Sequence, residues 1–185
     1  MPCLTNLNVS SIHLDITRWN LPSLKHFAIG YLGTGPRVPP RTPPRDVVRL
    51  LPRNSYQLLS LMVFSPYKLV LNPSFWYAHP FLECLGVTQY EMQAGPSLEH
   101  PLSTICFNFA STGTDGDHFL QMAQHLVFFP WISTLITPNL DRRNIAEEEE
   151  SSCVELIKIC STRNIRWYVG HGERFEYTPQ GQSKW

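Results

Sequence analysis

LLSLMV, residues 58–63, has apolar side chains at its first, fourth and sixth positions. Its second half alternates between apolar and small or flexible residues, which is typical of a short, half-buried strand. The same spacing recurs in LTNLNV (4–9), LECLGV (82–87), LSTICF (102–107) and ISTLIT (132–137), and in a longer form in LPSLKHFAI (21–29). NIRWYV (164–169) ends the series with Ile165, Trp167 and Val169 alternating. In the unit at 132–137 the last apolar position fails, because Thr137 occupies it.

Helices are expected between some of these strands. Residues 117–128 form the clearest one, ended by Pro130. Its apolar stripe comprises Phe119, Met122, Ala123, Leu126 and Val127. A second helix is expected over 146–162, with the stripe Cys153, Leu156, Ile157 and Cys160. A third, shorter helix is expected over 45–51, between Pro44 and Pro52.

Alternation of strands with helices or loops predicts an α/β fold. We expect an irregular leucine-rich-repeat-like solenoid of short parallel strands, with helices and loops on the other face. The strand anchors follow at 24, 58, 82, 102, 132 and 165, whereas regular repeats keep to about 20–29 residues. An ordinary doubly wound sheet is the alternative. The expected domain covers 1–170, followed by a C-terminal tail over 171–185.

Composition narrows the function classes. The formal net charge of the 185 residues is zero, which argues against nucleic-acid or membrane-surface binding by bulk charge. No apolar run approaches the ~18 residues that a membrane span needs. The five cysteines are scattered without a C-x-x-C pair, which favours reduced thiols in a cytoplasmic or nuclear protein.

A proline- and arginine-rich stretch, GTGPRVPPRTPPRD (33–46), interrupts the repeats. It is expected to be an exposed loop of polyproline II character. It fits both R-x-x-P-x-x-P and P-x-x-P-x-R, so it is either a ligand for aromatic-lined grooves or a plain linker. Arginines spaced by four residues also predict a basic helix stripe or a solvated face. The candidate partner-binding residues are Arg37, Pro40, Pro43, Arg45 and Arg49.

An enzyme is the alternative function class. Asp115 and Asp117 in FASTGTDGDHF, or His171 and Glu173 after the last strand, could hold a metal, bind a phosphate or act as acid and base. The favoured interpretation of the two aspartates is the N-terminal cap of the 117–128 helix. We predict no catalytic, metal-binding or cofactor-binding residue, no cofactor and no small-molecule substrate.

Together LTNLNV, WNLPSLKHFAIGYL, LLSLMVF, PFLECLGV, HPLSTICF and ELIKICSTRNIRWYV resemble the leucine-rich-repeat part of divergent fungal F-box-type proteins. The resemblance runs from about Leu4 to Val169. It implies a non-enzymatic protein–protein interaction module, similar to the substrate-binding part of a ubiquitin-ligase receptor. The chain starts within a repeat, so we expect the F-box itself to be absent. It also lacks the asparagine that closes most such repeats.

Overall fold

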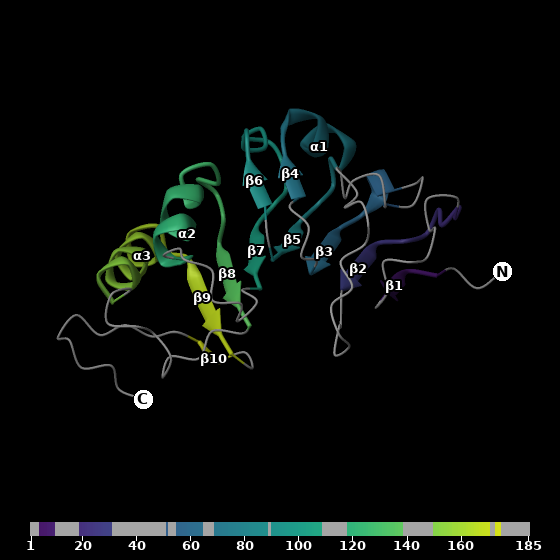
Figure 1. Cartoon of the computed structure of the whole chain (residues 1–185). Helices are drawn as coiled ribbons and strands as arrows, with labels where there is room; N and C mark the ends of the chain where they lie inside the picture. The colour runs from purple at the N-terminus through teal and green to yellow at the C-terminus, as the bar shows by residue number, and fades with distance from the viewer. Residues whose placement is uncertain are drawn as a thin grey trace, which may run out of the picture. The chain divides into compact units, whose positions relative to one another are not determined.

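The computed structural model describes residues 4–9, 19–30, 51, 55–64, 69–88, 90–108, 118–138, 150–170 and 173–174 (Figure 1). The chain has an α/β fold whose strands are mostly parallel, as the sequence predicts. It divides into two compact units, Met1–Leu102 and Ser103–Trp185. In the described residues no helix has the length and apolar character to cross a membrane.

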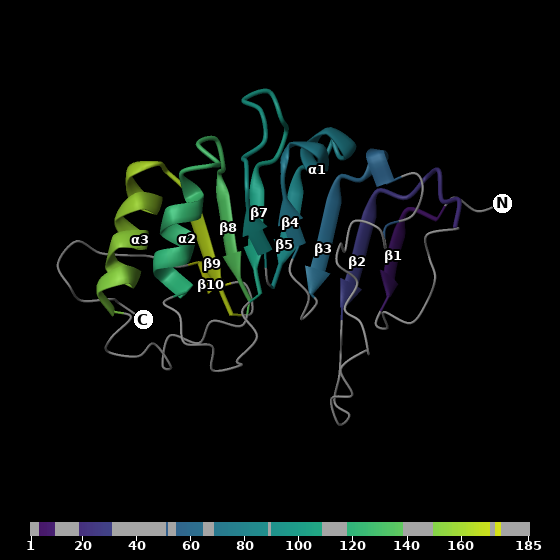
Figure 2. The same cartoon turned by 45° about the horizontal axis from the view of Figure 1, so that its top comes forward.

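Four parallel strands form the sheet of the first unit (Figure 2). They pair in the order β1 (Asn6–Val9), β2 (His26–Gly30), β3 (Ser60–Phe64) and β5 (Cys84–Val87). All four were expected from the repeated pattern. Their register aligns the apolar positions: Phe27 pairs with Leu61 and Leu61 with Leu85, so these buried side chains form one column. Burial of such a column stabilises the sheet by roughly 25 cal/mol for each Å² of apolar surface removed from water.

Strands β2, β3 and β5 are entered in the same way. The Thr5 carbonyl accepts hydrogen bonds from the amides of Lys25 and His26, both at 2.9 Å. One strand on, the Lys25 carbonyl accepts from Leu59 and Ser60, and the Leu59 carbonyl accepts from Glu83 and Cys84. The anchor leucines just before these positions, Leu24, Leu58 and Leu82, are at most 1% exposed. The L-x-x-L-x-L spacing thus corresponds to one repeated backbone geometry.

Four further elements of the first unit were not predicted. Strands β4 (Leu69–Leu71) and β6 (Tyr90–Met92) form a separate parallel pair. Helix α1 (Pro73–Ala78) follows β4, and the short 3-10 helix η3 (Ser55–Gln57) precedes β3. These elements are only three to six residues long, so periodicity over a window of a dozen residues could not detect them.

The second unit repeats the parallel arrangement. Strands β7 (Thr104–Phe107), β8 (Thr134–Thr137) and β9 (Arg166–Val169) are parallel, and β10 (Glu173–Arg174) runs antiparallel to β9. The Ser103 carbonyl accepts from the amides of Ser133 and Thr134, as in the first unit. Helices α2 (His118–Leu126) and α3 (Glu150–Thr162) pack side by side (Figures 1 and 2).

The predicted stripe of α2 is correct except at its end. Phe119, Met122, Ala123 and Leu126 are buried, but Val127 is 76% exposed. The helix stops at Leu126, and the next residues form a turn in which the Phe128 amide donates to His125 and the Phe129 amide to Leu126. Phe129, rather than Val127, therefore fills the core beyond the helix. The prediction for Val127 was wrong because it extended helical periodicity past the last helical turn.

The predicted stripe of α3 is confirmed, with Cys153, Leu156, Ile157 and Cys160 all buried. Asn164 ends this helix in the left-handed region, at φ 56°, and the Ile165 amide donates back to the Cys160 carbonyl at 2.8 Å. This arrangement satisfies a terminal carbonyl and turns the chain into β9. The part of the predicted helix before Glu150 lies outside the described residues, as does the predicted 45–51 helix apart from Leu51.

Thr137 occupies a core position without breaking the strand. It is fully buried, and its hydroxyl accepts a hydrogen bond from the indole Nε1 of Trp167 at 3.0 Å. The same hydroxyl donates to the Tyr168 carbonyl at 3.4 Å. A buried hydroxyl that both accepts and donates a hydrogen bond carries little desolvation penalty, so a polar residue is tolerated in the apolar column.

Candidate interaction surfaces

The residues predicted to bind a partner, Arg37, Pro40, Pro43, Arg45 and Arg49, lie outside the described residues. Their role stays a prediction.

The residues of the enzyme alternative are similarly placed. Asp115, Asp117 and His171 lie outside the described residues, and of Glu173 only the backbone, in β10, is described. The described ranges contain no group of three or more histidine, cysteine or acidic side chains that could hold a metal ion.

The outward face of the strands is the first candidate surface. In the first unit the side chains that alternate with the buried columns are small, polar or flexible. Register pairs Asn6 with His26, His26 with Ser60 and Ser60 with Cys84, which makes a polar row at the start of the strands. Asn6 and His26 are exposed, whereas Ser60 and Cys84 are half-buried. Gly86, further along β5, is buried, so the face is most open over β1 to β3.

The second unit has a matching row on its own strands. Thr104 pairs with Thr134, and Thr134 pairs with Arg166. The two threonines are half-buried and the arginine is exposed, while Cys106 on the same face of β7 is buried. This row can donate and accept hydrogen bonds, as the row of the first unit can.

A cleft beside α1 is the second candidate surface. Its volume is about 1010 Å³, and the side chains that line it come from η3, α1 and the segment 95–100. Figure 2 shows α1 at the end of the first unit's sheet where β2 and β3 begin. The lining side chains include Tyr56, Pro73, Trp76, Tyr77, Pro80 and Glu99.

The sequence around α1 explains why a helix begins there. The Asn72 side chain accepts a hydrogen bond from the Phe75 amide at 2.9 Å, which caps the helix. Pro73 occupies the first turn, where its fixed φ suits a helix and its missing N–H costs nothing. Asn-Pro is therefore a local signal that could have revealed this helix from the sequence.

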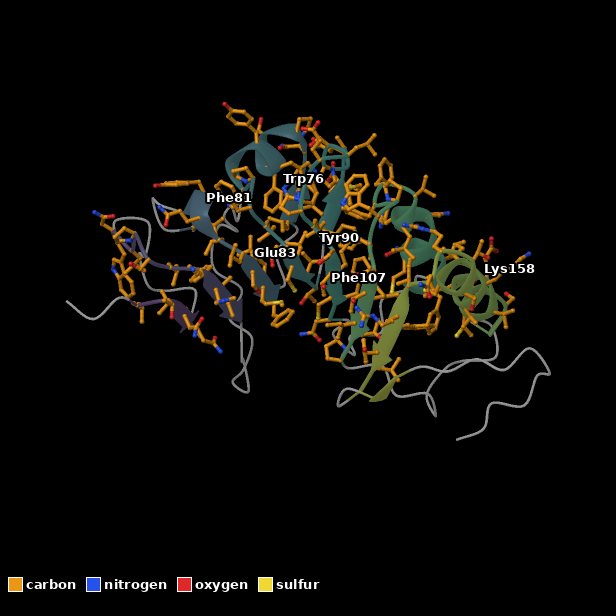
Figure 3. All side chains as sticks on the ribbon, turned by 180° about the vertical axis from the view of Figure 1, so that it is seen from behind. Trp76, Phe81, Glu83, Tyr90, Phe107 and Lys158 are labelled. Carbon is orange, nitrogen blue, oxygen red and sulfur yellow. The ribbon has the colours of Figure 1, made fainter. Side chains whose placement is uncertain are left out.

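Two contacts join α1 to the opposite wall of the cleft. The indole Nε1 of Trp76 donates to the Ala94 carbonyl at 2.7 Å. His100 meets the Trp76 ring edge-on, with ring centroids 5.5 Å apart. In Figure 3 Trp76 lies beneath α1, whereas Phe81, which follows the helix, is at the surface. The floor of the cleft is thus held in place by side-chain packing and a partly buried hydrogen bond.

Two histidines lie under the cleft, and their hydrogen bonds define which ring nitrogens donate. Nδ1 of His100 accepts from the Leu102 amide at 3.3 Å, so its Nε2 carries the proton and donates to the His79 carbonyl at 3.0 Å. His79 is fully buried, and its Nδ1 donates to the Phe75 carbonyl at 2.8 Å. Burial lowers the pKa of both rings, which are therefore neutral near pH 7. Nδ1 of His79 and Nε2 of His100 are both used in hydrogen bonds to backbone carbonyls, which fixes the position of the two rings.

The thiols of Cys84 and Cys160 are unsuited to nucleophilic chemistry. Neither residue forms a disulfide. Burial raises the pKa of the Cys84 thiol, and it raises the pKa of Cys160 to about 12. The reactive species is the thiolate, so these side chains are protonated and inert at neutral pH.

No protein-family model, no curated protein and no solved structure matches this chain.

Proposed function

We propose that this chain is a non-enzymatic protein-binding module of irregular leucine-rich-repeat type, which holds a polypeptide partner against the outward face of its strands. The observation that carries the proposal is the repeated strand entry, in which one carbonyl accepts from two successive amides of the next strand. Repeats of this kind place equivalent side chains side by side and so generate an extended surface. Such a surface binds a partner without needing any catalytic group.

The chemistry of the open face favours a protein partner. The exposed and half-buried positions over β1 to β3 are neutral or weakly basic, with amide, hydroxyl and imidazole groups. These groups pair with the backbone and side chains of a polypeptide. Among the described residues of β1 to β3, this face has no row of lysine and arginine that would track a phosphate backbone. The resemblance to F-box-type receptors supports the same class of partner, a protein destined for ubiquitin ligation.

Site-specific photo-crosslinking tests this proposal. A photo-reactive amino acid replaces Met62, a half-buried residue at the middle of β3 on the outward face. We expect ultraviolet light to link this position to a protein partner in cells. Ser60→Arg, which places a bulky charge two residues away on the same face, should reduce the yield at least tenfold.

A matched probe at Lys158, an exposed residue on the outer side of α3 (Figure 3), serves as the control. Capture of the same proteins with equal yield from Lys158 would argue against a binding site on the strand face. So would a crosslink at Met62 that survives Ser60→Arg.

A further inference from the structure

The cleft beside α1 has aromatic rings and prolines on its surface. Tyr77 is 90% exposed and Tyr56 is 49% exposed, while Trp76 closes the floor. Pro73 and Pro80 complete the apolar lining at the two ends of α1. Grooves lined by aromatic rings bind extended polyproline II segments, because proline rings pack between aromatic side chains and a preformed helix loses little entropy on binding.

An apolar rim extends the cleft. Phe81 is 56% exposed and Leu98 is 80% exposed, and both are immediate chain neighbours of lining residues. Covering a large exposed apolar side chain with a partner lowers the free energy, because its apolar surface leaves water. Several together beside a cleft are typical of a protein-binding site.

The charge of the cleft is acidic. Glu99 is the charged residue among the described side chains that line it, and no lysine or arginine is present in that lining. Glu99 is itself exposed. A carboxylate at the edge of an aromatic groove complements an arginine, whose guanidinium can bind the carboxylate in two places and stack on a ring.

The walls of the cleft are held in place without a ligand. The Trp76–Ala94 hydrogen bond joins α1 to the far wall. The bond from His100 to the His79 carbonyl joins the end of that wall to the residue after α1. A preformed groove costs little ordering entropy when a peptide enters.

We propose that this cleft binds an extended segment of a partner protein that is rich in proline and carries arginine. Prolines pack against Tyr56 and Tyr77, and an arginine side chain pairs with Glu99. The carbonyl groups of a polyproline II segment have no internal partners, so the hydroxyls of Tyr77 and Ser97 are available donors for them. This site goes beyond the strand face of the proposed function and uses different residues.

Titration calorimetry tests the proposal on the full chain and on a variant in which Pro39, Pro40, Pro43 and Pro44 are replaced with alanine, so that the chain's own segment cannot compete with the peptide. The probe is the nine-residue peptide RVPPRTPPR, which has the sequence of residues 37–45. We expect saturable one-to-one binding. Tyr77→Ala should weaken it by about tenfold, because the exposed ring supplies contact area but no core packing. Glu99→Gln should weaken it by about fivefold at low salt and by less at high salt.

Matched controls separate the cleft from general effects. Val127→Ala removes another largely exposed apolar side chain elsewhere, and Glu155→Gln removes an exposed carboxylate on α3. Both should leave the affinity unchanged. Circular dichroism should show an unchanged fold for all four variants, since each altered side chain is exposed.

Three results would overturn the proposal. The first is the absence of saturable binding at millimolar peptide. The second is equal binding by a peptide whose prolines are all replaced with alanine, which would indicate a mere attraction between charges. The third is self-association that Tyr77→Ala abolishes, without peptide binding, which would make a second copy of this chain the occupant. In each case crosslinking at Met62 would still report on the strand face.

Discussion

At the scale of single residues, Thr137 shows how a polar group is accepted in an apolar column. Replacement by valine keeps the shape but removes the acceptor of the Trp167 Nε1 hydrogen bond. We expect Thr137→Val to lower the free energy of unfolding by about 1–3 kcal/mol, measured by urea denaturation, because a buried donor loses this partner. Thr137→Ser should retain most of the stability, since it keeps the hydroxyl.

Thr134→Val is the matched control for this comparison. Thr134 lies on the same strand but is half-buried on the outward face. Its replacement should change stability by less than ~0.5 kcal/mol. A Thr137→Val variant as stable as the parent would show that the hydrogen bond contributes nothing.

His79 is the residue that should make the first unit sensitive to acid. Its pKa is lowered in the folded state, chiefly by burial, so the unfolded chain binds a proton at higher pH than the folded chain does. The contribution of His79 to the free energy of unfolding is therefore fully present above pH ~6.5. It falls as the pH drops below that value, by at most about 1.4 kcal/mol per pH unit for each proton. We expect His79→Phe to flatten this fall, measured by chemical denaturation from pH 7.5 to 5.

A variant that perturbs packing without removing the titrating group provides the control. Phe75→Leu removes the aromatic ring whose centroid lies 4.7 Å from the centroid of the His79 ring. It should lower stability at every pH and leave the slope unchanged. The same slope in His79→Phe as in the parent would exclude His79 as the source, and His100, whose pKa is also lowered, would then be the candidate.

At the scale of elements, one arginine joins the ends of two helices. Arg163 follows α3, and its guanidinium donates to the carbonyl of Leu126 at 2.8 Å and to that of Phe129. Both carbonyls lie at or just beyond the end of α2, where backbone acceptors lack helical partners. We expect Arg163→Met to lower the free energy of unfolding by about 1.5–3 kcal/mol in urea denaturation.

Arg163→Lys tests the geometry of this contact, because lysine keeps the charge but cannot donate in a fork. Arg163→Lys should therefore recover less than half of the free energy of unfolding that Arg163→Met loses. Lys158→Met, at an exposed position on α3, should have little effect on the free energy of unfolding. Equal stability of the methionine and arginine forms at position 163 would mean that the amides of Phe129 and Ile132, together with solvent, satisfy the two carbonyls.

At the scale of the whole molecule, the order of the strands predicts which backbone amides are protected. In the first unit β3 is paired on both sides, with β2 and β5, whereas β1 pairs with β2 alone among the described strands. We expect amide exchange in β3 to be at least about tenfold slower than in β1, because an end strand can open without disrupting a second ladder. Hydrogen exchange with mass spectrometry measures this. Equal rates would indicate that the sheet opens as one cooperative unit.

The repeated strands were predictable from the sequence because one local geometry produces one local pattern. The anchor leucine lies buried in the turn before each strand. The residues after it alternate between apolar and other types because successive side chains of a strand point to opposite faces. LLSLMV and LECLGV thus predicted β3 and β5 with their buried sides correct. The buried faces of α2 and α3 were predicted for the same reason, apart from Val127, which follows the end of its helix.

The cleft was not predictable in this way. Tyr56, Tyr77 and Glu99 are far apart in the chain and share no period, and α1 is a single short helix. They lie together because Trp76 and His100 hold α1 against the segment before β7. Sequence periodicity reports which side of an element is buried, but not which elements meet.

The sequence by itself determined the α/β class, the parallel strands and the side chains that form the buried columns, since these follow from spacing along one element. The tertiary structure alone decided the position of α1, the hydrogen bonds of Thr137 and Arg163, and the grouping of aromatic rings around Glu99. Those features depend on contacts between residues 18 to 43 positions apart, and the spacing of residues along one element carries no information about such contacts.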